Sequence, residues 1–288
     1  MHIKPVIIAE IGCNHKGDIN LAKELIKSAA LCGADYAKFQ KRSNKYLLGS
    51  KYYHEHPQPH NSYGKTYGEH RDFLEFNISQ HFDLYKFCLK NKIKYAVSVW
   101  EKISAEEIVN SKIKLDYIKI PSACNLDFEL IEYLCLKFKG KIHLSLGMTT
   151  RTEIQNIFNF FKKKKRNKDL IFYICTSDYP VKFEDLCLLE IKYLQKLYLK
   201  NINSIGFSGH HLGIAADISA YTLGSFIIER HFTLDRTWKG TDHAASLEPS
   251  GLSKLIRDLN HVYSALKYKN EPILDSEKTS REKLKIKY

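Results

Sequence analysis

Short apolar runs recur along the chain, separated by longer amphipathic segments. Each run spans four to six residues, is rich in β-branched or aromatic side chains, and predicts a buried β-strand. The predicted strands cover residues 6–10, 35–40, 94–98, 116–120, 142–145, 170–174, 203–207 and 226–230. The intervening segments favour helices, and the first of them places on one helical face the residues Ile19, Ala22, Leu25, Ile26 and Ala29.

This alternation of strand and helix predicts the fold class. Eight such units running in one direction favour a closed (β/α)8 barrel, or TIM barrel, over an open sheet. A chain of 288 residues suits one such domain, since this barrel commonly needs about 250 residues. We therefore expect a single domain over residues 1–288, with a short C-terminal tail at about 265–288. One connection, at about 41–78, is oversized, and a loop that long in a compact domain is usually functional.

The charge balance is strongly basic, with 45 Lys and Arg against 32 Asp and Glu and a formal net charge of +13. Such a surplus can indicate nucleic-acid binding. The lysines are spread along the chain, however, and the dense run at 162–166 ends a helical pattern, where cations suit the helix dipole. We therefore expect a solvated Lys-rich surface and anionic substrates, and no nucleic-acid partner.

The cysteine pattern and the absence of long apolar segments bear on location. The chain has seven cysteines, an odd number without a C-x-x-C pair, which favours reduced thiols in a cytoplasm. The N-terminal apolar run is too short for a signal peptide, and no window approaches about 18 apolar residues. We expect a cytoplasmic protein that does not enter a membrane.

Polar residues gather where the predicted strands end. In a (β/α)8 barrel the chemistry lies at the C-terminal ends of the strands. This rule selects Glu10, Asn14, Lys38, Gln40, Lys119, Ser122, Ser145, Ser177, Tyr179, His210, His231 and Asp242.

Two lysines among these residues lie inside apolar strands. Lys38 and Lys119 would be costly to bury unless each meets an anion, although either could also extend from the strand end to water. Their position at the same end of different strands indicates a phosphate or carboxylate in the barrel mouth. The serines near the strand ends could donate hydrogen bonds to the same group, although singly each is ordinary turn chemistry.

Two histidines end neighbouring apolar runs. A helical stretch from Leu212 to Leu223 joins the last two predicted strands, so their C-terminal ends lie on one rim. His210 and His231 then lie side by side, and a strand spacing of about 4.8 Å allows two imidazoles to reach one metal ion. The alternative is that one histidine caps a strand and the other is a satisfied core group.

Several segments together resemble a known family. They are A-E-I-G-C-N-H-K-G-D at 9–18, G-A-D-Y-A-K-F-Q at 33–40, D-Y-I-K-I-P-S-A-C-N at 116–125, L-S-L-G-M at 144–148, C-T-S-D-Y-P at 175–180 and the stretch from Gly206 to Pro249. In this order they resemble the nonulosonic (sialic) acid synthase family, which condenses phosphoenolpyruvate with an amino-sugar aldehyde. The resemblance runs from about Ile7 to about Asp258.

The resemblance implies roles for the rim residues. The phosphate of phosphoenolpyruvate would be held by Lys119, Ser122, Ser145, Ser177 and Ser208, with Lys38 also on the anion. His210 and His231 would bind a divalent ion, Mn²⁺ or Mg²⁺, that makes the aldehyde more electrophilic. The sugar or the reacting centre would be faced by Glu10, Gln40, Tyr179 and Asp242. Catalytic roles are expected for Glu10, Lys38 and Asp242, and either carboxylate could accept the proton of the water that adds.

The departures from the family pattern bear on the identity of the sugar more than on the use of phosphoenolpyruvate. Gly209 and His211 flank the first metal histidine, Cys124 stands where a family glutamate is expected, and Ser177 replaces an asparagine. The sequence ends at Tyr288, where most relatives continue into a small antifreeze-like domain that contributes an arginine to the neighbouring subunit. The 41–78 loop would then serve as an acceptor lid, with Tyr67 and Arg71 as substrate contacts. A homodimer is a further expectation.

Three functional hypotheses remain open from the sequence. The first is the synthase acting on an N-acetylmannosamine-like or related amino sugar. The second is another phosphoenolpyruvate-dependent aldol synthase with a neutral or phosphorylated aldose. That function would require extra arginines at the rim, and the loop offers only Arg42 and Arg71, with no obvious cluster. The third is a basic, non-catalytic binding module.

Overall fold

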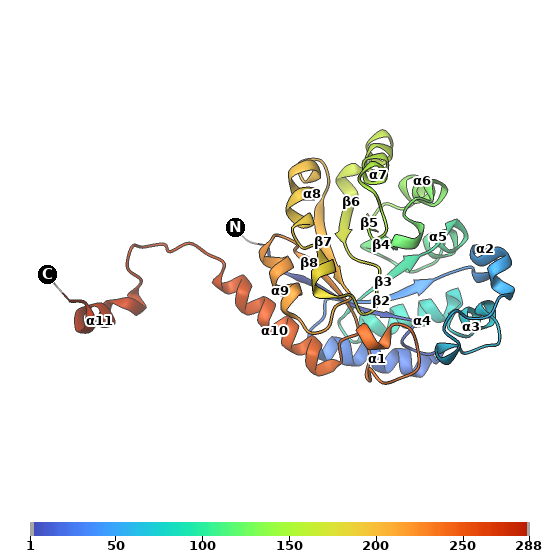
Figure 1. Cartoon of the computed structure of the whole chain (residues 1–288), viewed down its shortest axis with the longest axis horizontal. Helices are drawn as coiled ribbons and strands as arrows, with labels where there is room; N and C mark the ends of the chain where they lie inside the picture. The colour runs from blue at the N-terminus through green and yellow to red at the C-terminus, as the bar shows by residue number, and fades with distance from the viewer. Residues whose placement is uncertain (1–2, 287–288) are drawn as a thin grey trace.

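Eight parallel strands close into a barrel in the computed structural model, which describes residues 3–286 (Figure 1). Each strand pairs with the next in sequence order, and β1 pairs with β8. The strands are β1 Val6–Gly12, β2 Tyr36–Lys41, β3 Lys94–Val99, β4 Tyr117–Ile120, β5 Lys141–Ser145, β6 Leu170–Ile174, β7 Ser204–Gly209 and β8 Ile227–His231. The predicted fold class is confirmed, and each predicted strand coincides with an observed one to within two residues.

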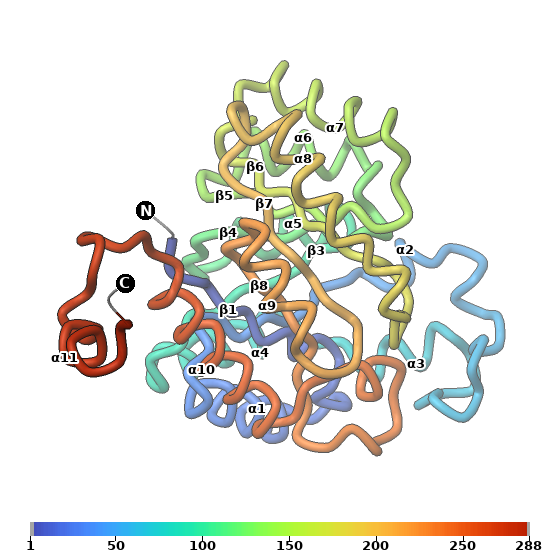
Figure 2. Tube along the Cα trace, turned by 60° about the vertical axis from the view of Figure 1, so that its left-hand side comes forward, coloured from blue at the N-terminus to red at the C-terminus, as the bar shows by residue number. Residues whose placement is uncertain are grey.

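Helices cover the outside of the barrel (Figures 1 and 2). They are α1 Ile19–Cys32, α4 Ile78–Lys90, α5 Lys102–Val109, α6 Phe128–Lys137, α7 Arg151–Lys163, α8 Glu190–Tyr198, α9 Ala215–Thr222 and α10 Pro249–Ala265. In α1 the Asp18 side chain accepts from the backbone N–H groups of Asn20 and Leu21, a cap that contributes about 1 kcal/mol. Four residues of the predicted face, Ala22, Leu25, Ile26 and Ala29, are buried, and the fifth, Ile19, is partly buried against the core.

The chain leaves the barrel after α10 (Figures 1 and 2). A linker leads to α11 (Asp275–Leu284), which has no buried residue. Residues 1–2 and 287–288, the ends of the predicted domain and tail, lie outside the described residues. None of the helices between residues 3 and 286 combines the length and apolar character needed to cross a bilayer.

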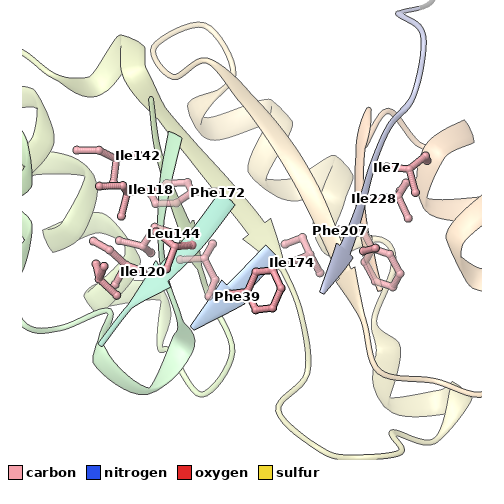
Figure 3. Packing of buried hydrophobic residues seen from close by; sticks show 14 of the residues in the cluster. Ile7, Phe39, Ile118, Ile120, Ile142, Leu144, Phe172, Ile174, Phe207 and Ile228 are labelled. Atoms are coloured by element: carbon pink, nitrogen blue, oxygen red, sulfur yellow. The ribbon is translucent and has the colours of Figure 1, made fainter. Parts of the chain in front are cut away.

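Alternation along the strands separates an apolar outer face from a polar inner one. Successive strand side chains point to opposite faces of the sheet. Figure 3 shows part of the outer set, with Ile118, Leu144 and Phe172 packed between strands and helices. The inside of the barrel holds a small apolar cluster of Ile8, Ala96, Tyr117, Ile171 and Tyr173. Charged and hydroxyl side chains lie further along the same inner face, toward the strand C-termini, so the barrel mouth is polar.

The connection between β2 and α4 folds into short helices instead of an irregular loop. It contains α2 (Asn44–Leu48), two 3₁₀ helices at Gly49–Tyr53 and Pro59–Asn61, and α3 (Tyr67–Phe73). A capping box of Thr66 and Glu69 starts α3, which satisfies backbone N–H groups that would otherwise lack partners. The connection runs from the end of β2 at Lys41 to the start of α4 at Ile78.

Buried neutral histidines predict a loss of stability in acid. Burial lowers the pKa of His15 and of His81 to about 3, against about 6.5 in an unfolded chain. Between these values only the unfolded chain binds the proton. The stability present above pH 6.5 is therefore lost as the pH falls, by up to about 1.4 kcal/mol per pH unit for each histidine.

We expect His81→Gln to flatten the pH dependence of the free energy of unfolding, measured in urea between pH 6 and pH 4.5, by about that slope. The exposed His54→Gln is the matched control and should keep the slope of the unsubstituted protein. An unchanged slope in His81→Gln would contradict the assignment.

Candidate active site

A cavity of about 660 Å³ opens at the C-terminal ends of the strands. This volume lies within the usual range for small-molecule sites. Apart from Asn14 and Tyr67, the predicted site residues line it, namely Glu10, Lys38, Gln40, Arg71, Lys119, Ser122, Ser145, Ser177, Tyr179, Ser208, His210, His231 and Asp242. The structure therefore brings residues from all parts of the sequence to one concave surface.

A buried ionic cluster forms the floor of this cavity. Lys38 Nζ lies 2.5 Å from Glu10 Oε2 and 3.6 Å from Glu229 Oε1, and Lys119 Nζ lies 2.6 Å from Glu229 Oε1. All four side chains are nearly inaccessible to water. We call Glu10, Lys38, Lys119 and Glu229 the ionic cluster. Two cations and two carboxylates balance one another, which is the condition for burying so much charge.

The environment of the cluster shifts its proton affinities. Burial opposes the charged form of Glu229, but the ammonium groups of Lys119 and Lys38 outweigh it and lower the pKa of this carboxyl. Burial together with the charge of Lys38 lowers the pKa of Lys119 despite the attraction of Glu229. Burial also opposes the charge on Lys38, yet the carboxylates of Glu10 and Glu229 raise its pKa. The two lysines therefore differ, since the pKa of Lys38 is raised and that of Lys119 is lowered.

Aromatic rings support the cluster from below. The rings of Tyr117 and His143 stack with centroids 3.7 Å apart. His143 Nδ1 lies 2.9 Å from the hydroxyl of Tyr173, and Lys119 Nζ lies 4.5 Å from the centre of the Tyr173 ring. These contacts hold the Lys119 side chain at its position along the barrel axis.

A group of hydroxyls lies beside Lys119 at the ends of β4, β5 and β6. The backbone N–H of Gly147 donates to Ser122 Oγ at 3.0 Å, and Ser122 Oγ lies 3.2 Å from Cys175 Sγ. A Cβ at Gly147 would lie 2.4 Å from Ser177 Oγ and 2.8 Å from Ser122 Oγ, so only glycine allows these groups to converge. Hydroxyls and a backbone N–H around a small space are suited to bind an anion.

His210 and His231, the two predicted histidines, lie at the ends of β7 and β8, the next strands around the barrel after this group. Their ring centroids are 5.5 Å apart. His210 Nδ1 lies 2.7 Å from the carbonyl oxygen of Thr176, which can only accept, so Nδ1 carries the proton and Nε2 keeps a free lone pair. Burial, followed by the charge of His231, lowers the pKa of His210 to about 3. The imidazole is therefore neutral, as a metal ligand must be.

His231 completes a donor pair that fits a divalent cation. Its Nδ1 is buried without a hydrogen-bond partner and lies 3.8 Å from Asp242 Oδ2. The Tyr179 ring packs on His210 at 4.1 Å and against the edge of His231 at 5.7 Å. In residues 3–286 no three His, Cys, Asp or Glu side chains are grouped to hold an ion, so the protein's ligands would be this pair.

Known proteins resemble the chain over this whole region. A sequence profile described as the NeuB family matches residues 25–271. The chain belongs to the NeuB family. The resemblance predicted from the sequence motifs is thereby confirmed.

Named relatives of this NeuB-family protein are synthases. N-acetylneuraminate-9-phosphate synthase of Mus musculus is 37% identical over 96% of this chain and 76% of its own length. N,N'-diacetyllegionaminic acid synthase of Campylobacter jejuni is 31% identical over 91% of this chain and 78% of its own length. The crystal structure of N-acetylneuraminic acid synthetase from Leptospira borgpetersenii superposes with a TM-score of 0.81 at 29% identity, covering 99% of this chain and 94% of that one.

The outer wall of the NeuB-family cavity comes from two connections that touch. The β2–α4 connection contributes Gln58, Asn61 and Arg71, and the loop before α10 contributes residues from Arg236 to Ala244. Gly240 N donates to Asn61 Oδ1 at 3.3 Å, and the Tyr63 hydroxyl donates to the carbonyl oxygen of Lys239. The two connections therefore form one wall.

Three residues emphasised by the sequence do not face the cavity. Tyr67 lies behind the wall, where its hydroxyl accepts from Arg71 Nε at 3.1 Å and Nη2 at 2.8 Å. Asn14 binds the carbonyl oxygen of Phe232 and the hydroxyl of Ser246, both at 2.9 Å, so it fastens β1 to the last loop. His211 is fully buried beside Asp217 and Arg230, because α9 begins only at Ala215 and the turn before it packs inward.

Several cavity residues were missed by the sequence reasoning. Glu229 is the main one, although a charge in I-I-E-R-H two residues before His231 shares its face by strand alternation. A carboxylate inside an apolar strand needs a cationic partner, just as Lys38 and Lys119 need an anion. Arg42 and Arg236 also line the cavity, together with Ser98, Trp100 and Trp238. Three arginines thus share the wall, where the sequence showed no obvious cluster, because they come from connections far apart in the chain.

The pairing within the ionic cluster predicts a coupled stability effect. Glu229→Gln removes the carboxylate that Lys119 contacts, whereas Lys38 keeps Glu10. Breaking a buried pair in this way costs about 3–5 kcal/mol, so we expect a loss of that size in the free energy of unfolding in urea.

The double variant Glu229→Gln/Lys119→Met removes the stranded cation and should recover at least half of that loss. Glu190→Gln breaks the pair with Arg151 at the partly exposed Glu190 and should change the free energy of unfolding by less than about 1 kcal/mol. Additive losses in the double variant would show that the pair does not stabilise the floor.

Proposed function

We propose that this chain condenses phosphoenolpyruvate with the aldehyde of an amino sugar, giving a sialic-acid-like 3-deoxy-2-keto acid and phosphate for surface carbohydrate biosynthesis. The named synthases of the family support this reaction class. The structural support is one arrangement, in which a hydroxyl-lined anion site next to Lys119 and a neutral histidine pair open into the same cavity. In this proposal the anion site binds phosphoenolpyruvate, and the histidine pair lies where the acceptor aldehyde is activated.

The donor's phosphate binds in the group formed by Ser122, Ser177 and the backbone N–H of Gly147. Ser145 ends β5, Ser208 lies in β7, and both line the cavity. Lys119 supplies the charge, and its exchange from Glu229 to the phosphate keeps the buried ammonium paired throughout. Lys38 remains with Glu10 and Glu229 and is available to the donor's carboxylate.

His210 and His231 would hold a divalent cation, Mn²⁺ or Mg²⁺. When bound, the cation withdraws electron density from the aldehyde oxygen, which makes the carbonyl carbon a better electrophile. The hydrogen bond to Thr176 keeps Nε2 of His210 in the tautomer that donates a lone pair.

The bond changes of the proposed reaction balance as follows. C3 of phosphoenolpyruvate forms a bond to the aldehyde carbon, whose oxygen takes up a proton. Water adds to C2, where positive character develops, and gives up one proton, which balances the proton taken up by the aldehyde oxygen. The C2–O bond then breaks, the second water proton leaves with phosphate, and C2 becomes the keto carbon. Glu10 and Asp242 are the predicted carboxylates placed to accept the water proton. The pKa of Asp242 is lowered, because the charge of His231, a hydrogen bond from Thr241 and nearby arginines outweigh its burial, so it is ionised and able to act as a base.

Other expectations from the sequence stay predictions. They are a cytoplasmic location, a homodimer and the absence of a nucleic-acid partner. The relatives' names differ in one respect, since the mouse protein's name specifies a 9-phosphate and the Campylobacter protein's name does not. The acceptor of this chain is therefore defined here only as an amino-sugar aldehyde.

We expect phosphate release from phosphoenolpyruvate to require both an acceptor sugar and a divalent cation. Two protein ligands hold a cation weakly, so treatment with EDTA should abolish turnover and Mn²⁺ should restore it. His231→Ala should bind less Mn²⁺ in equilibrium dialysis and remain inactive, whereas the exposed His261→Ala should behave like the unsubstituted protein. Normal turnover by EDTA-treated His231→Ala would refute the metal role. A basic binding module would release no phosphate with any acceptor.

We expect Gly147→Ala to raise the KM for phosphoenolpyruvate more than the KM for the acceptor. The added methyl displaces Ser122 and Ser177, and losing one charge-assisted contact costs about 1.5–3 kcal/mol, or one to two powers of ten in affinity. Steady-state kinetics with each substrate varied in turn measures the split. Gly251→Ala, in α10 with its nearest Cβ contact at 3.4 Å, is the control. An equal rise in both KM values would place the donor's phosphate elsewhere.

A further inference from the structure

The donor's phosphate and Glu229 compete for one buried ammonium group. Lys119 Nζ lies 2.6 Å from Glu229 Oε1, and Lys119 is nearly inaccessible to water. In the proposed function this ammonium leaves Glu229 for the phosphate, and a buried cation without a close partner is costly. A third neighbour that attracts a cation without carrying a charge would favour the transfer, because it does not compete with the phosphate.

The face of the Tyr173 ring is such a neighbour. Lys119 Nζ lies over this face, 4.5 Å from the ring centre, which is within the range of a cation–π interaction. The interaction is strongest where water is excluded, and both side chains are buried. Tyr173 does not belong to the cavity lining, so it can act on a bound donor only through Lys119.

The ring lies on the side of Lys119 that faces the proposed donor site. Glu229 belongs to β8, whereas Tyr173 belongs to β6, and β6 leads into Cys175 and Ser177 of the cavity lining. In a closed barrel ordered β1 to β8, β6 lies between β4 and β8. An ammonium that moves from Glu229 toward the ends of β4 to β6 therefore moves toward the ring. This difference matters, since a contact of equal strength in both positions would not favour either.

Two contacts fix the orientation of the ring. The hydroxyl of Tyr173 lies 2.9 Å from His143 Nδ1. On β7, a Cβ added at Gly206 would lie 2.8 Å from Cε1 and 2.9 Å from Cζ of the same ring, so glycine allows the ring to lie directly against the backbone. The ring is therefore held with its face toward Lys119.

The residues around Lys119 at this level carry no charge of their own. Burial, followed by the charge of Lys119, lowers the pKa of His143 well below its usual value. Burial, followed by the charge of Glu229, raises the pKa of Tyr173 well above its usual value. The imidazole and the phenol are therefore neutral near neutral pH, and the ionic cluster keeps its balance of two cations and two carboxylates.

Packing alone does not require an aromatic ring at this position. The interior apolar cluster that contains Tyr173 also contains Ile8, Ala96 and Ile171, so an aliphatic side chain would serve equally well for apolar burial. An aliphatic side chain cannot supply the negative face of an aromatic ring. A packing role and a role toward Lys119 therefore predict different effects on donor binding.

We propose, resting on the proposed function, that Tyr173 is a positioning residue for Lys119. Its ring face, held by His143 and Gly206, stabilises the ammonium in the position where it meets the donor's phosphate. Tyr173 touches no reacting atom, so its effect is on the affinity for phosphoenolpyruvate and not on that for the acceptor.

The test varies the charge distribution of the ring at nearly constant size. Tyr173→Phe keeps the ring and is the reference, and the same position is then filled with phenylalanines that carry one, two or three ring fluorines. Fluorine withdraws electron density from the ring face and so weakens the quadrupole that attracts a cation. We expect the KM for phosphoenolpyruvate to rise with each fluorine, by about 10-fold in total, which corresponds to about 1.4 kcal/mol. The KM for the acceptor should not rise.

Phe172 is the matched control. It is the preceding residue of β6, is equally buried, and belongs to the outer apolar set (Figure 3). The same fluorinated residues at position 172 should leave both KM values unchanged. Equilibrium dialysis of labelled phosphoenolpyruvate without an acceptor should show the same trend in the Kd of the position 173 series as in its KM.

A KM for phosphoenolpyruvate that stays constant across the position 173 series would overturn this inference while leaving the proposed function intact. Equal rises in the KM values of donor and acceptor would also overturn it. If the unsubstituted protein consumed no phosphoenolpyruvate with Mn²⁺ and a panel of amino-sugar aldehydes, the proposed function itself would be overturned, and the inference with it.

Discussion

The buried ionic cluster of Glu10, Lys38, Lys119 and Glu229 is the constraint on which the site depends. Its members come from β1, β2, β4 and β8, so they meet only if the barrel closes in the observed register. An unpaired charge at this depth would cost several kcal/mol. The same strand positions that balance these charges also fix His231, which pairs in register with Glu10. The barrel therefore cannot close in this register without also bringing the site residues together.

The charge balance within the ionic cluster affects how the cavity binds an anion. Because each lysine already contacts a carboxylate, an anion that binds Lys119 must take the place of Glu229, and the groups around the lysine add to its affinity. Around Lys119 these are the serine hydroxyls and the Gly147 N–H. In the outer wall the donors are guanidinium groups held by a ring, a phenol and a carbonyl oxygen. The cavity thus carries hydrogen-bond donors on two sides, and the histidine pair lines the same cavity.

The sequence was sufficient for the fold, because short apolar runs alternating with amphipathic helical segments are local signals. It also placed most cavity residues, since strand ends share one rim in this barrel. Two kinds of information were absent. Pairing partners such as Glu229 for Lys119 depend on strand register, and the cavity wall depends on contact between connections near residues 60 and 240. Asn14 and Tyr67 were placed at the surface of the site because composition cannot distinguish a residue that contacts a ligand from one that supports its neighbour.

The central claim is that the C2–O bond of phosphoenolpyruvate breaks, and not the bond between that oxygen and phosphorus. The direct measurement uses donor labelled with ¹⁸O in the bridge between C2 and phosphorus, incubated with the protein, Mn²⁺ and the acceptor sugars. Mass analysis then locates the label. Condensation with water addition at C2 predicts labelled phosphate and a product that contains the carbon atoms of both substrates. Unlabelled phosphate together with labelled pyruvate would show simple phosphate-ester hydrolysis and contradict the account.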